Sequence, residues 1–419
     1  MLTLSTTRGC GGSIKGAPED FIVREIAVNG LTLHEVRGYS AADLGETESP
    51  EGKFTKFIMQ KRDWDTINAL IRIAKILGRG KKSVGYCGTK DRMSVSVQLA
   101  SIFGVIPEQV LGLRLNGISI NGAWRSSTGA EMGANLGNAF SATIKACTDA
   151  GAIGRTIEEL DSKMPNYYDR QRFGIRLNNF GIGMRLLKGD FEGAAMKFLT
   201  DTKLEANPDS IDARLRLAEK RDFAQALDYF PRNLRNERSV IGYLSRYDNY
   251  ANALRKLPRG ILLMFVHSVQ SLIFNAALQE RIKEKDLDAD VCCGSNFYGF
   301  PDIQSIAPKG DIPACALPGY ETKKELVDEY VREAMDRLEL TLEDFRIKGM
   351  PELGTKGSFR ALLAPIKALS YEAAQGSARI DFSIPAGSYA TVLLNEITKS
   401  DELSLGDITS DNKLRQRVT

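Results

Sequence analysis

Histidine and cysteine are scarce in this sequence, and their scarcity excludes several kinds of active site. The 419 residues include two histidines, His34 and His267, which lie far apart along the chain. The six cysteines show no CxxC spacing, and Cys292 and Cys293 are adjacent, which does not suit a disulfide framework. Zinc hydrolases and enzymes with a histidine-based triad are therefore disfavoured. We expect reduced cytosolic thiols and an activity that needs no metal.

The sequence also lacks a large excess of charge and a long apolar run. Its 56 Lys and Arg residues against 53 Asp and Glu residues give a net charge of +3, so total charge does not indicate a nucleic-acid partner. The strongest apolar run, ILLMFV at 261–266, is far shorter than the ~20 residues that span a bilayer. The first ten residues lack the apolar segment of a signal peptide. We expect a soluble, cytoplasmic globular protein with no membrane contact.

The first hundred residues contain strand patterns around one helix pattern. Residues 20–36 alternate apolar and polar positions about the turn sequence Asn29-Gly30, which predicts an antiparallel hairpin. Apolar residues at helical spacing predict a helix that begins at Asp65 or Thr66 and ends at Gly78. Strands are predicted at Ser83 to Cys87 and again from about Ser94, so the GTKDR sequence between them is a loop.

The middle of the chain has a different pattern from its two ends. Strands are expected at 139–145 and near 360–367, and residues 379–394 predict a strand, a turn and a helix. From about 190 to 350 helix patterns prevail, most clearly at 260–284. A helix-rich block between two strand-bearing blocks predicts one α/β domain interrupted by an inserted domain.

Positive charge is concentrated between residues 51 and 92. This window holds eleven cations and four anions, a net charge of +7, which leaves about −4 for the rest of the chain. Such a cluster can contact phosphates, although a basic run on one helix is more often a solvated face. The cations in the window are Lys53, Lys56, Lys61, Arg62, Arg72, Lys75, Arg79, Lys81, Lys82, Lys90 and Arg92.

Asp91 lies in the GTKDR loop between Lys90 and Arg92. Flanking cations favour the ionised carboxylate, and a loop can expose it, so Asp91 could act as a nucleophile or a base. An aspartate in a loop more often forms hydrogen bonds with its own turn. The residue pattern by itself leaves the second interpretation ahead.

Five short sequences, in order along the chain, resemble the TruD family of pseudouridine synthases. They are PEDFIVREI at 18–26, GYCGTKDR with Gln98 at 85–98, GNAF at 137–140, PNYYDRQRFG at 165–174 and FSIPAGSYATVLLNEI at 382–397. The resemblance implies an α/β (α+β) fold, in which a pseudouridine-synthase catalytic domain with a mixed, largely antiparallel sheet carries an inserted helix-rich TRUD domain. We assign residues 1–190 and 351–419 to the catalytic domain and 191–350 to the insertion.

The resemblance also implies a function and a set of site residues. Asp91 would be the catalytic residue, and the substrate would be tRNA, typically the uridine at position 13, with no cofactor or metal. The positions that match the substrate-binding residues of the family are Lys15, Phe21, Asn166, Tyr168 and Tyr389. We add as candidates for contact with the RNA backbone Lys81, Lys82, Lys90, Arg92 and Arg172. The oligomeric state is not predicted.

The chemistry of this reaction explains the residue types. Isomerisation of uridine breaks the N-glycosidic bond and rejoins uracil through carbon five without net oxidation, so one carboxylate can serve. The base must leave its stack, and aromatic faces such as those of Phe21, Tyr168 and Tyr389 could hold it. Without the family match, Phe21 and Tyr389 would be interpreted as core residues. Lys15 could pair with Asp91.

Two departures and two alternatives stay open. Asp169 replaces the glycine that usually follows the family's NYF, and Asn395 replaces the arginine common near its C-terminal end. These changes put the local geometry in doubt rather than the family. The alternatives are an RNA-binding protein of the same fold without activity and a carboxylate-dependent N-glycosidase, which would release the base and so lower the product mass.

Overall fold

The computed structural model describes residues 1–14, 16–289, 291–293, 296–297, 300–301, 306–307 and 312–400. Its main element is one mixed sheet of nine strands in the order β16-β17-β7-β2-β5-β3-β6, with β1 paired to β7 and β4 paired to β5. All neighbours are antiparallel except β2 and β5, which are parallel. The strands are β1 (Ser13–Ile14), β2 (Phe21–Ile26), β3 (Phe54–Arg62), β4 (Val84–Tyr86), β5 (Val95–Phe103), β6 (Ile118–Ser126), β7 (Gly137–Lys145), β16 (Lys367–Ala374) and β17 (Ser377–Pro385). The prediction of a mixed, largely antiparallel sheet is confirmed.

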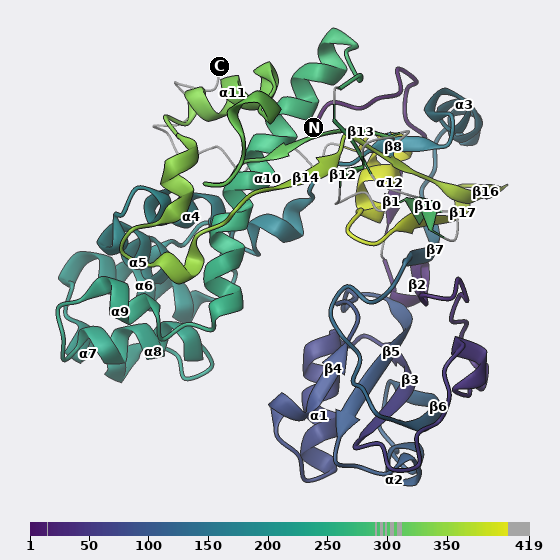
Figure 1. The fold of residues 1–419 in the computed structure, drawn as a ribbon, viewed down its shortest axis with the longest axis horizontal. Coiled ribbons are helices and arrows are strands. Elements are labelled where there is room, and N and C mark those ends of the chain that lie inside the picture. The colour runs from purple at the N-terminus through teal and green to yellow at the C-terminus, as the bar shows by residue number, and fades with distance from the viewer. Residues whose placement is uncertain are drawn as a thin grey trace.

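Different helices cover the two ends of the sheet. At the β16-β17-β7 end, α3 (Ala150–Leu160) and α12 (Ala390–Thr398) contribute side chains to one apolar cluster with the strands. At the β5-β3-β6 end, α1 (Thr66–Ile76) and α2 (Pro107–Leu111) form a second cluster. Figure 1 shows these ends at the upper right and lower right, with β2 between them.

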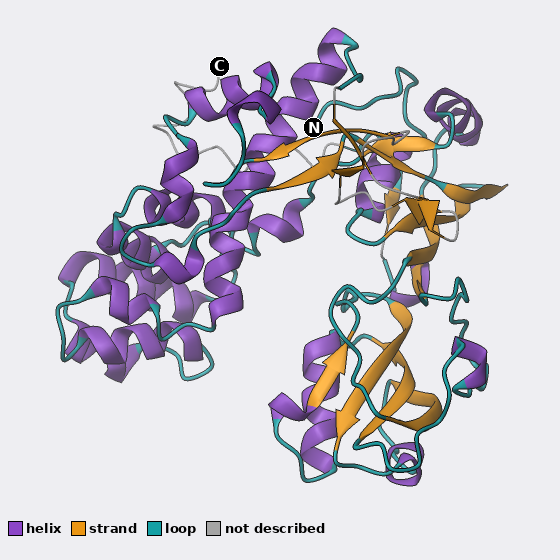
Figure 2. Ribbon diagram, in the orientation of Figure 1, coloured by secondary structure: helices purple, strands orange, loops and turns teal. Residues whose placement is uncertain are grey.

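A block of helices lies beside the sheet, on the left in Figures 1 and 2. Its helices are α4 (Asn179–Leu187), α5 (Phe191–Thr200), α6 (Pro208–Lys220), α7 (Phe223–Tyr229), α8 (Arg235–Leu244), α9 (Tyr250–Leu254), α10 (Arg259–Glu284) and α11 (Glu329–Arg337). Their buried side chains form one apolar cluster, which also includes residues between Tyr167 and Leu187. A division of the chain at 191 and 350 therefore stays a prediction.

Short strands connect the helical block to the large sheet. A four-stranded sheet has the order β12-β9-β13-β14, while β15 pairs with β8 and β10 pairs with β11. These strands are β8 (Lys163–Pro165), β9 (Val291–Cys293), β10 (Asn296–Phe297), β11 (Phe300–Pro301), β12 (Ile306–Ala307), β13 (Ile312–Leu317), β14 (Ser358–Ala361) and β15 (Leu363–Pro365). The 3-10 helices are η1 (Pro18–Asp20), η2 (Ala42–Leu44), η3 (Lys81–Ser83), η4 (Arg170–Phe173), η5 (Lys324–Leu326), η6 (Leu342–Arg346) and η7 (Pro351–Leu353).

The predicted helix and loop around residue 80 form as expected. The Asp65 carboxylate caps α1 by accepting a hydrogen bond from the backbone NH of Asn68, and Gly78 adopts a φ of 68° just after the helix. The GTKDR sequence joins β4 to β5, which pair antiparallel. The loop that carries Asp91 is therefore held between two adjacent strands.

The predicted opening hairpin forms only in part. The turn at Asn29 and Gly30 forms, with φ of 86° at Gly30, but the two arms share only one bridge, between Ile26 and Thr32. Strand β2 instead pairs with β7 and β5. The local pattern identified a strand, but the strands that pair with the two edges of β2 come from far along the chain.

Helix α10 is the one described element that bears on whether the chain contacts a membrane. By length and composition its 26 residues could cross one, because the helix continues well beyond the short apolar run seen in the sequence. In the structure, 72% of its most apolar window is buried among other elements. The helix is thus the central helix of the helical block.

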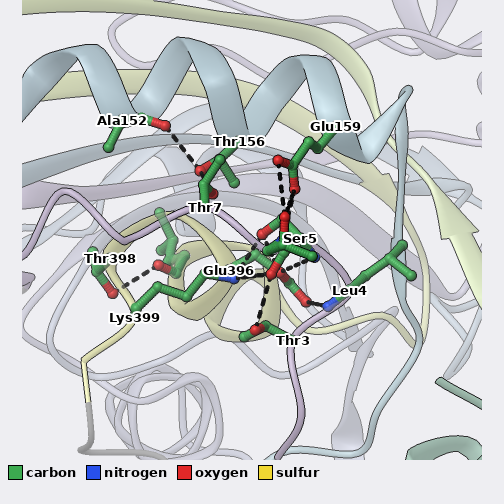
Figure 3. A network of polar contacts seen from close by, with 12 residues as sticks. Thr3, Leu4, Ser5, Thr7, Ala152, Thr156, Glu159, Glu396, Thr398 and Lys399 are labelled. Atoms are coloured by element: carbon green, nitrogen blue, oxygen red, sulfur yellow. Dashed lines mark hydrogen bonds and ion pairs between the residues drawn. The ribbon is translucent and has the colours of Figure 1, made fainter. Parts of the chain in front are cut away.

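The N-terminal segment is fastened to α12 by a buried carboxylate. Figure 3 shows Glu396 accepting hydrogen bonds from the backbone NH groups of Leu4 (2.6 Å) and Ser5 (3.2 Å) and from the Ser5 hydroxyl (2.8 Å). Lys399 completes this group with an ion pair to Glu396 at 3.1 Å. These contacts hold α12, and with it the turn that precedes it, against the sheet.

Candidate active site

A cavity of about 1050 Å³ opens where the sheet meets the helical block. Its wall includes strand β2, the β4–β5 loop, the β6–β7 loop, η4, one side chain of α10 and the turn before α12. These segments come from separate parts of the sequence, so the cavity exists only in the folded chain. Lining side chains used below are Phe21, Asp91, Phe140, Gln171, Arg172 and Tyr389.

A buried lysine holds the backbone of Asp91 in place. The ammonium group of Lys61, on β3, donates to the carbonyl oxygen of Asp91 at 2.8 Å, and the Ser94 hydroxyl donates to the same oxygen at 2.7 Å. Lys61 has no exposed surface, and burial lowers its pKa to about 8. Lys61 therefore holds the loop while adding positive charge beneath it at neutral pH.

The rest of the loop is anchored by side chains of α1 and β5. The Gln98 amide donates to the carbonyl of Gly88 at 3.0 Å, and the Thr66 hydroxyl accepts from the backbone NH of Lys90 at 2.9 Å. Thr66 and Gln98 also bond to each other at 2.8 Å. Because Thr66 and Gln98 are themselves buried, the path of the loop is set by the interior of the sheet.

The two cations that flank Asp91 in sequence pair with other carboxylates. The Lys90 ammonium lies 2.7 Å from Glu25, and both side chains are almost fully buried. Arg92 pairs with Asp63 at 3.1 Å on the surface. The effect of these two cations on Asp91, which their adjacency in sequence suggested, therefore stays a prediction. Lys90 lines the cavity but is almost fully buried in its ion pair, which does not favour a phosphate contact.

The carboxylate of Asp91 receives a hydrogen bond that the sequence analysis did not foresee. The side-chain amide of Gln171, on η4, donates to Asp91 Oδ1. Both residues line the cavity although they are 80 positions apart. Gln171 and Asp91 belong to motifs far apart along the chain, and no local signal could have paired them.

Two of the predicted aromatic residues line the cavity with Asp91. The Phe21 ring lies 5.6 Å from the Phe140 ring, measured between centroids, and both rings form part of the wall. Tyr389 lies at the opposite end of the chain, just before α12, and burial raises the pKa of its hydroxyl. The structure thus brings Phe21, Asp91 and Tyr389 to one site.

Asn166 and Tyr168 lie behind this wall rather than in it. Asn166 is fully buried and holds Arg360, whose guanidinium donates to its backbone oxygen at 2.9 Å and its side-chain oxygen at 2.7 Å. The same guanidinium lies 4.0 Å from the centroid of the buried Tyr168 ring. The Tyr168 ring also contacts Tyr389, with centroids 6.2 Å apart. This position does not support the expected direct stack of Tyr168 on uracil.

Arg360 connects this buried group to the cavity wall. It donates to the carbonyl oxygen of Gly387 at 2.9 Å, and the Ser388 hydroxyl donates to Asn166 at 3.1 Å. Gly387 and Ser388 belong to the turn that presents Tyr389. Sequence analysis missed Arg360, which is isolated from every motif and is 192 positions from Tyr168.

The remaining predicted cations are divided between the cavity and the surface. Arg172 lines the cavity, with its guanidinium 4.9 Å from the Tyr168 ring centroid. Lys81 and Lys82 are exposed on η3 and are not part of the cavity wall. Lys15 lies outside the described residues.

The predicted basic face is smaller than its sequence suggested. Within the window, Lys61 and Lys90 are buried, Lys56 pairs with Glu46 at 2.6 Å, and Arg62 forms an ion pair with Glu19. The exposed cations that remain around α1 and η3 include Arg72, Lys75, Lys81 and Lys82. Lys56 and Lys61 belong to β3, most of whose residues are buried, and nothing in their sequence indicated this.

The structure gives a role to one of the two departures from the family sequences, Asp169, and none to the other, Asn395. Asp169 is buried and accepts a hydrogen bond from the Thr391 hydroxyl at 2.6 Å, which ties the start of η4 to α12. Asn395 lies on α12 with its side-chain oxygen buried. Nothing in the structure explains the choice of asparagine there.

No described group of three or more histidine, cysteine, aspartate or glutamate side chains is arranged to hold a metal ion. His267, on α10, is not among the cavity-lining residues, and burial lowers its pKa to about 4. It is therefore neutral at pH 7. The expectation of a reaction without metal stays a prediction.

Together the fold and the site define an α/β enzyme class in which a loop aspartate faces a cavity walled by aromatic rings and cations. The family model for tRNA pseudouridine synthase D (TruD) matches residues 1–397. A "Probable tRNA pseudouridine synthase D" from Methanosarcina barkeri is 30% identical, over 95% of this chain and 96% of its own. A protein with the same name from Methanopyrus kandleri is 34% identical, over 84% and 86%.

A solved structure agrees with these sequence matches. The crystal structure of a Methanosarcina mazei protein, named as a candidate tRNA pseudouridine synthase D, superimposes with a TM-score of 0.72 and 27% identity over 96% of both chains. The chain belongs to the TruD family of tRNA pseudouridine synthases. It is an isomerase whose substrate is tRNA, as the resemblance of its motifs had implied.

Proposed function

We propose that Asp91 is the catalytic carboxylate of this tRNA pseudouridine synthase and that it acts on the uridine at position 13. The observation that carries the proposal is that Asp91, Phe21 and Tyr389 line one cavity. A base flipped out of the RNA needs a pocket with ring faces to stack on and a reactive group beside it. This cavity provides both, and its volume of about 1050 Å³ is ample for one nucleotide.

The reaction needs one carboxylate and no redox partner. The bond from N1 of uracil to C1′ of the ribose breaks, the ring turns, and a bond from C5 to C1′ forms. The proton lost from C5 is balanced by a proton gained at N1, so the product is an isomer of the substrate. The Asp91 carboxylate can assist as a nucleophile or as a base. The anchored loop supports either role by keeping the group in place.

The aromatic residues have separate roles in this proposal. Phe21 and Tyr389 stack on the flipped uracil, while Tyr168, Asn166 and Arg360 support the turn that carries Tyr389. The contact of Arg360 with Gly387 and that of Ser388 with Asn166 support this division. In this proposal Tyr168 does not contact the substrate and instead supports Tyr389.

We propose that two groups of cations contact the RNA backbone, one near the cavity and one farther from it. Arg172 and Arg92 lie near Asp91, and Lys81 with Lys82 extends the contact along the outside of the sheet.

We also propose that residues 191–350 form an inserted domain. A cytoplasmic location agrees with the free thiols of the described cysteines Cys10, Cys87, Cys147, Cys292 and Cys315.

The test replaces Asp91 by asparagine, which keeps the shape and removes the ionised oxygen. We expect loss of pseudouridine formation by about 10³-fold or more, because covalent or acid–base assistance is removed, with tRNA binding largely kept. Products of wild type and variant are mapped on a tRNA transcript and weighed by mass spectrometry. Wild-type turnover by Asp91→Asn contradicts the role of Asp91. A mass loss equal to uracil identifies a glycosidase instead, and modification elsewhere contradicts position 13.

A further inference from the structure

The Asp91 carboxylate is approached from across the cavity by a neutral amide. Gln171 Nε2 donates to Asp91 Oδ1, while the backbone oxygen of Asp91 is held separately by Lys61 and Ser94. The two kinds of contact fix different things. The backbone bonds fix where the residue lies, and a bond to one carboxylate oxygen fixes the rotation of the side chain about its last bond.

Gln171 itself lies on a rigid support. It belongs to η4, whose last residue, Phe173, is fully buried in the apolar cluster of the helical block. Gly174 follows with a φ of 82°, and a side chain there would collide with Asn179, whose amide donates to the carbonyl of Arg172 at 3.3 Å. The backbone at Gln171 is thus anchored to the helical block, which fixes the point from which its amide reaches Asp91.

The chemical nature of the donor also matters. An amide stabilises an ionised carboxylate by hydrogen bonding but carries no charge of its own. It can therefore orient a nucleophile or base without adding a second cation that would lower its reactivity further. Among the described residues, Lys61 places positive charge close to the Asp91 loop.

We propose that Gln171 is a positioning residue for this reaction, which orients the Asp91 carboxylate from the foot of the helical block. The inference rests on the proposed role of Asp91. It gives the helical block a direct part in catalysis, because the donor is fixed by the core of that block while the carboxylate is fixed by the sheet.

The experiment compares Gln171→Met, which removes the donor at similar length, with Gln171→Glu, which replaces it by a like charge. The matched control is Gln225→Glu, an exposed glutamine on α7 that is not part of the cavity wall. Initial rates with a tRNA transcript are measured from about pH 5 to pH 9 on all three variants, with thermal unfolding as a check on folding. Gln171 is exposed, so all three are expected to fold.

We expect Gln171→Met to lower kcat roughly 10- to 100-fold with KM within about twofold of wild type, because a misdirected catalytic group costs rate rather than binding. In Gln171→Glu the acidic limb of the pH–rate profile should move up by about one pH unit or more, since a neighbouring carboxylate raises the pKa of Asp91. Gln225→Glu should leave rate and profile unchanged.

Three results overturn the inference. If Gln171→Met raises KM with kcat unchanged, Gln171 binds RNA rather than Asp91. If Gln171→Glu lowers the rate without moving the acidic limb, the contact with Asp91 is absent in solution. If both variants match wild type while Asp91→Asn is inactive, the inference fails and the proposed function stands. An active Asp91→Asn variant contradicts the proposed function whatever the Gln171 variants do.

Discussion

Two buried ion pairs of similar geometry lie in the two halves of this enzyme. Lys90 and Glu25 join the β4–β5 loop to strand β2, with 2.7 Å between charged atoms and side chains 4% and 1% exposed. Arg214 and Glu237 join α6 to α8 at the same distance, with side chains 1% and 10% exposed. The first pair adjoins the cavity, and the second lies within the helical block.

The surroundings of the two pairs differ more than their geometry. Arg214 also lies 3.5 Å from Glu205 and donates to the carbonyl oxygens of Phe198 and Leu199. The planar fork of an arginine can satisfy several acceptors at once. Lys90 relies on Glu25, whose second oxygen accepts from the backbone NH of Leu99 at 3.0 Å. The helical block thus spreads a buried charge over a network, while the sheet uses one pair to hold the residue beside Asp91.

The largest expected effect comes from breaking the pair beside the cavity. Glu25→Gln leaves the Lys90 ammonium buried without a compensating charge, which costs about 3–5 kcal/mol of unfolding free energy. We also expect the specific activity of the folded variant to fall at least tenfold, because the Asp91 loop loses an anchor. Denaturant unfolding and single-turnover rates measured below the melting temperature separate the two effects.

Glu237→Gln provides the matched change in the helical block. Its cost in unfolding free energy should be smaller than that of Glu25→Gln, because Glu205 and two carbonyl oxygens remain around Arg214. The activity of the folded protein should be unchanged. Equal loss of activity in the two folded variants would show that the pair in the helical block affects the reaction as much as the pair beside the cavity, and the contrast between the halves would fail.

Lys61 is a third buried cation that can be compared with Lys90 and Arg214. Its ammonium donates to carbonyl oxygens rather than to a carboxylate. Its folded pKa of about 8 lies below the unfolded value of about 10.4. Between these values the unfolded chain binds a proton that the folded chain lacks, so this residue makes stability rise with pH. Below pH 8 both states are protonated, and the folded state bears the full cost of burying the charge.

The measurement is the difference in unfolding free energy between wild type and Lys61→Met at several pH values. Subtraction removes the other titrating groups and any constant cost of the missing hydrogen bonds. We expect wild type to gain on the variant by roughly 3 kcal/mol from about pH 7.5 to 10.5, as a fully buried group with this shift would. A difference that stays flat over this range would place the ammonium in contact with water.

The sequence was sufficient for elements with a strong local signal. The cap at Asp65, the turn at Gly78 and the loop that contains Asp91 depend on neighbouring residues, and all three were predicted. Phe21 and Tyr389 were assigned to the site by the resemblance, and both line the cavity. These positions could be found because the relevant information lies within a few residues of each.

Contacts between distant segments could not be predicted in this way. The bond from Gln171 to Asp91, the contact of Arg360 with Tyr168 and the parallel pairing of β2 with β5 each join segments more than 70 residues apart. Lys61 shows the same limit, since a lysine in a basic segment is expected to be exposed. Only the packing of both faces of β3 buries it.

The smallest expected effect concerns the exposed charge at the edge of the sheet. Each phosphate that a protein neutralises releases counterions, so replacing Lys81 and Lys82 together by alanine should weaken tRNA binding modestly. The slope of log affinity against log salt should flatten by about 0.7–0.9 for each phosphate no longer neutralised. Filter-binding titrations from about 50 to 200 mM salt measure this slope.

Lys323 and Lys324, another exposed pair at a 3-10 helix, supply the matched control in the same change to alanine. If the sheet carries the RNA-binding charge, replacing Lys81 and Lys82 should change the slope and replacing the control pair should not. An equal change in both double variants would assign the charge to both halves of the enzyme. An unchanged slope in both would leave Lys81 and Lys82 as a solvated face, because counterions are released only where a cation approaches a phosphate.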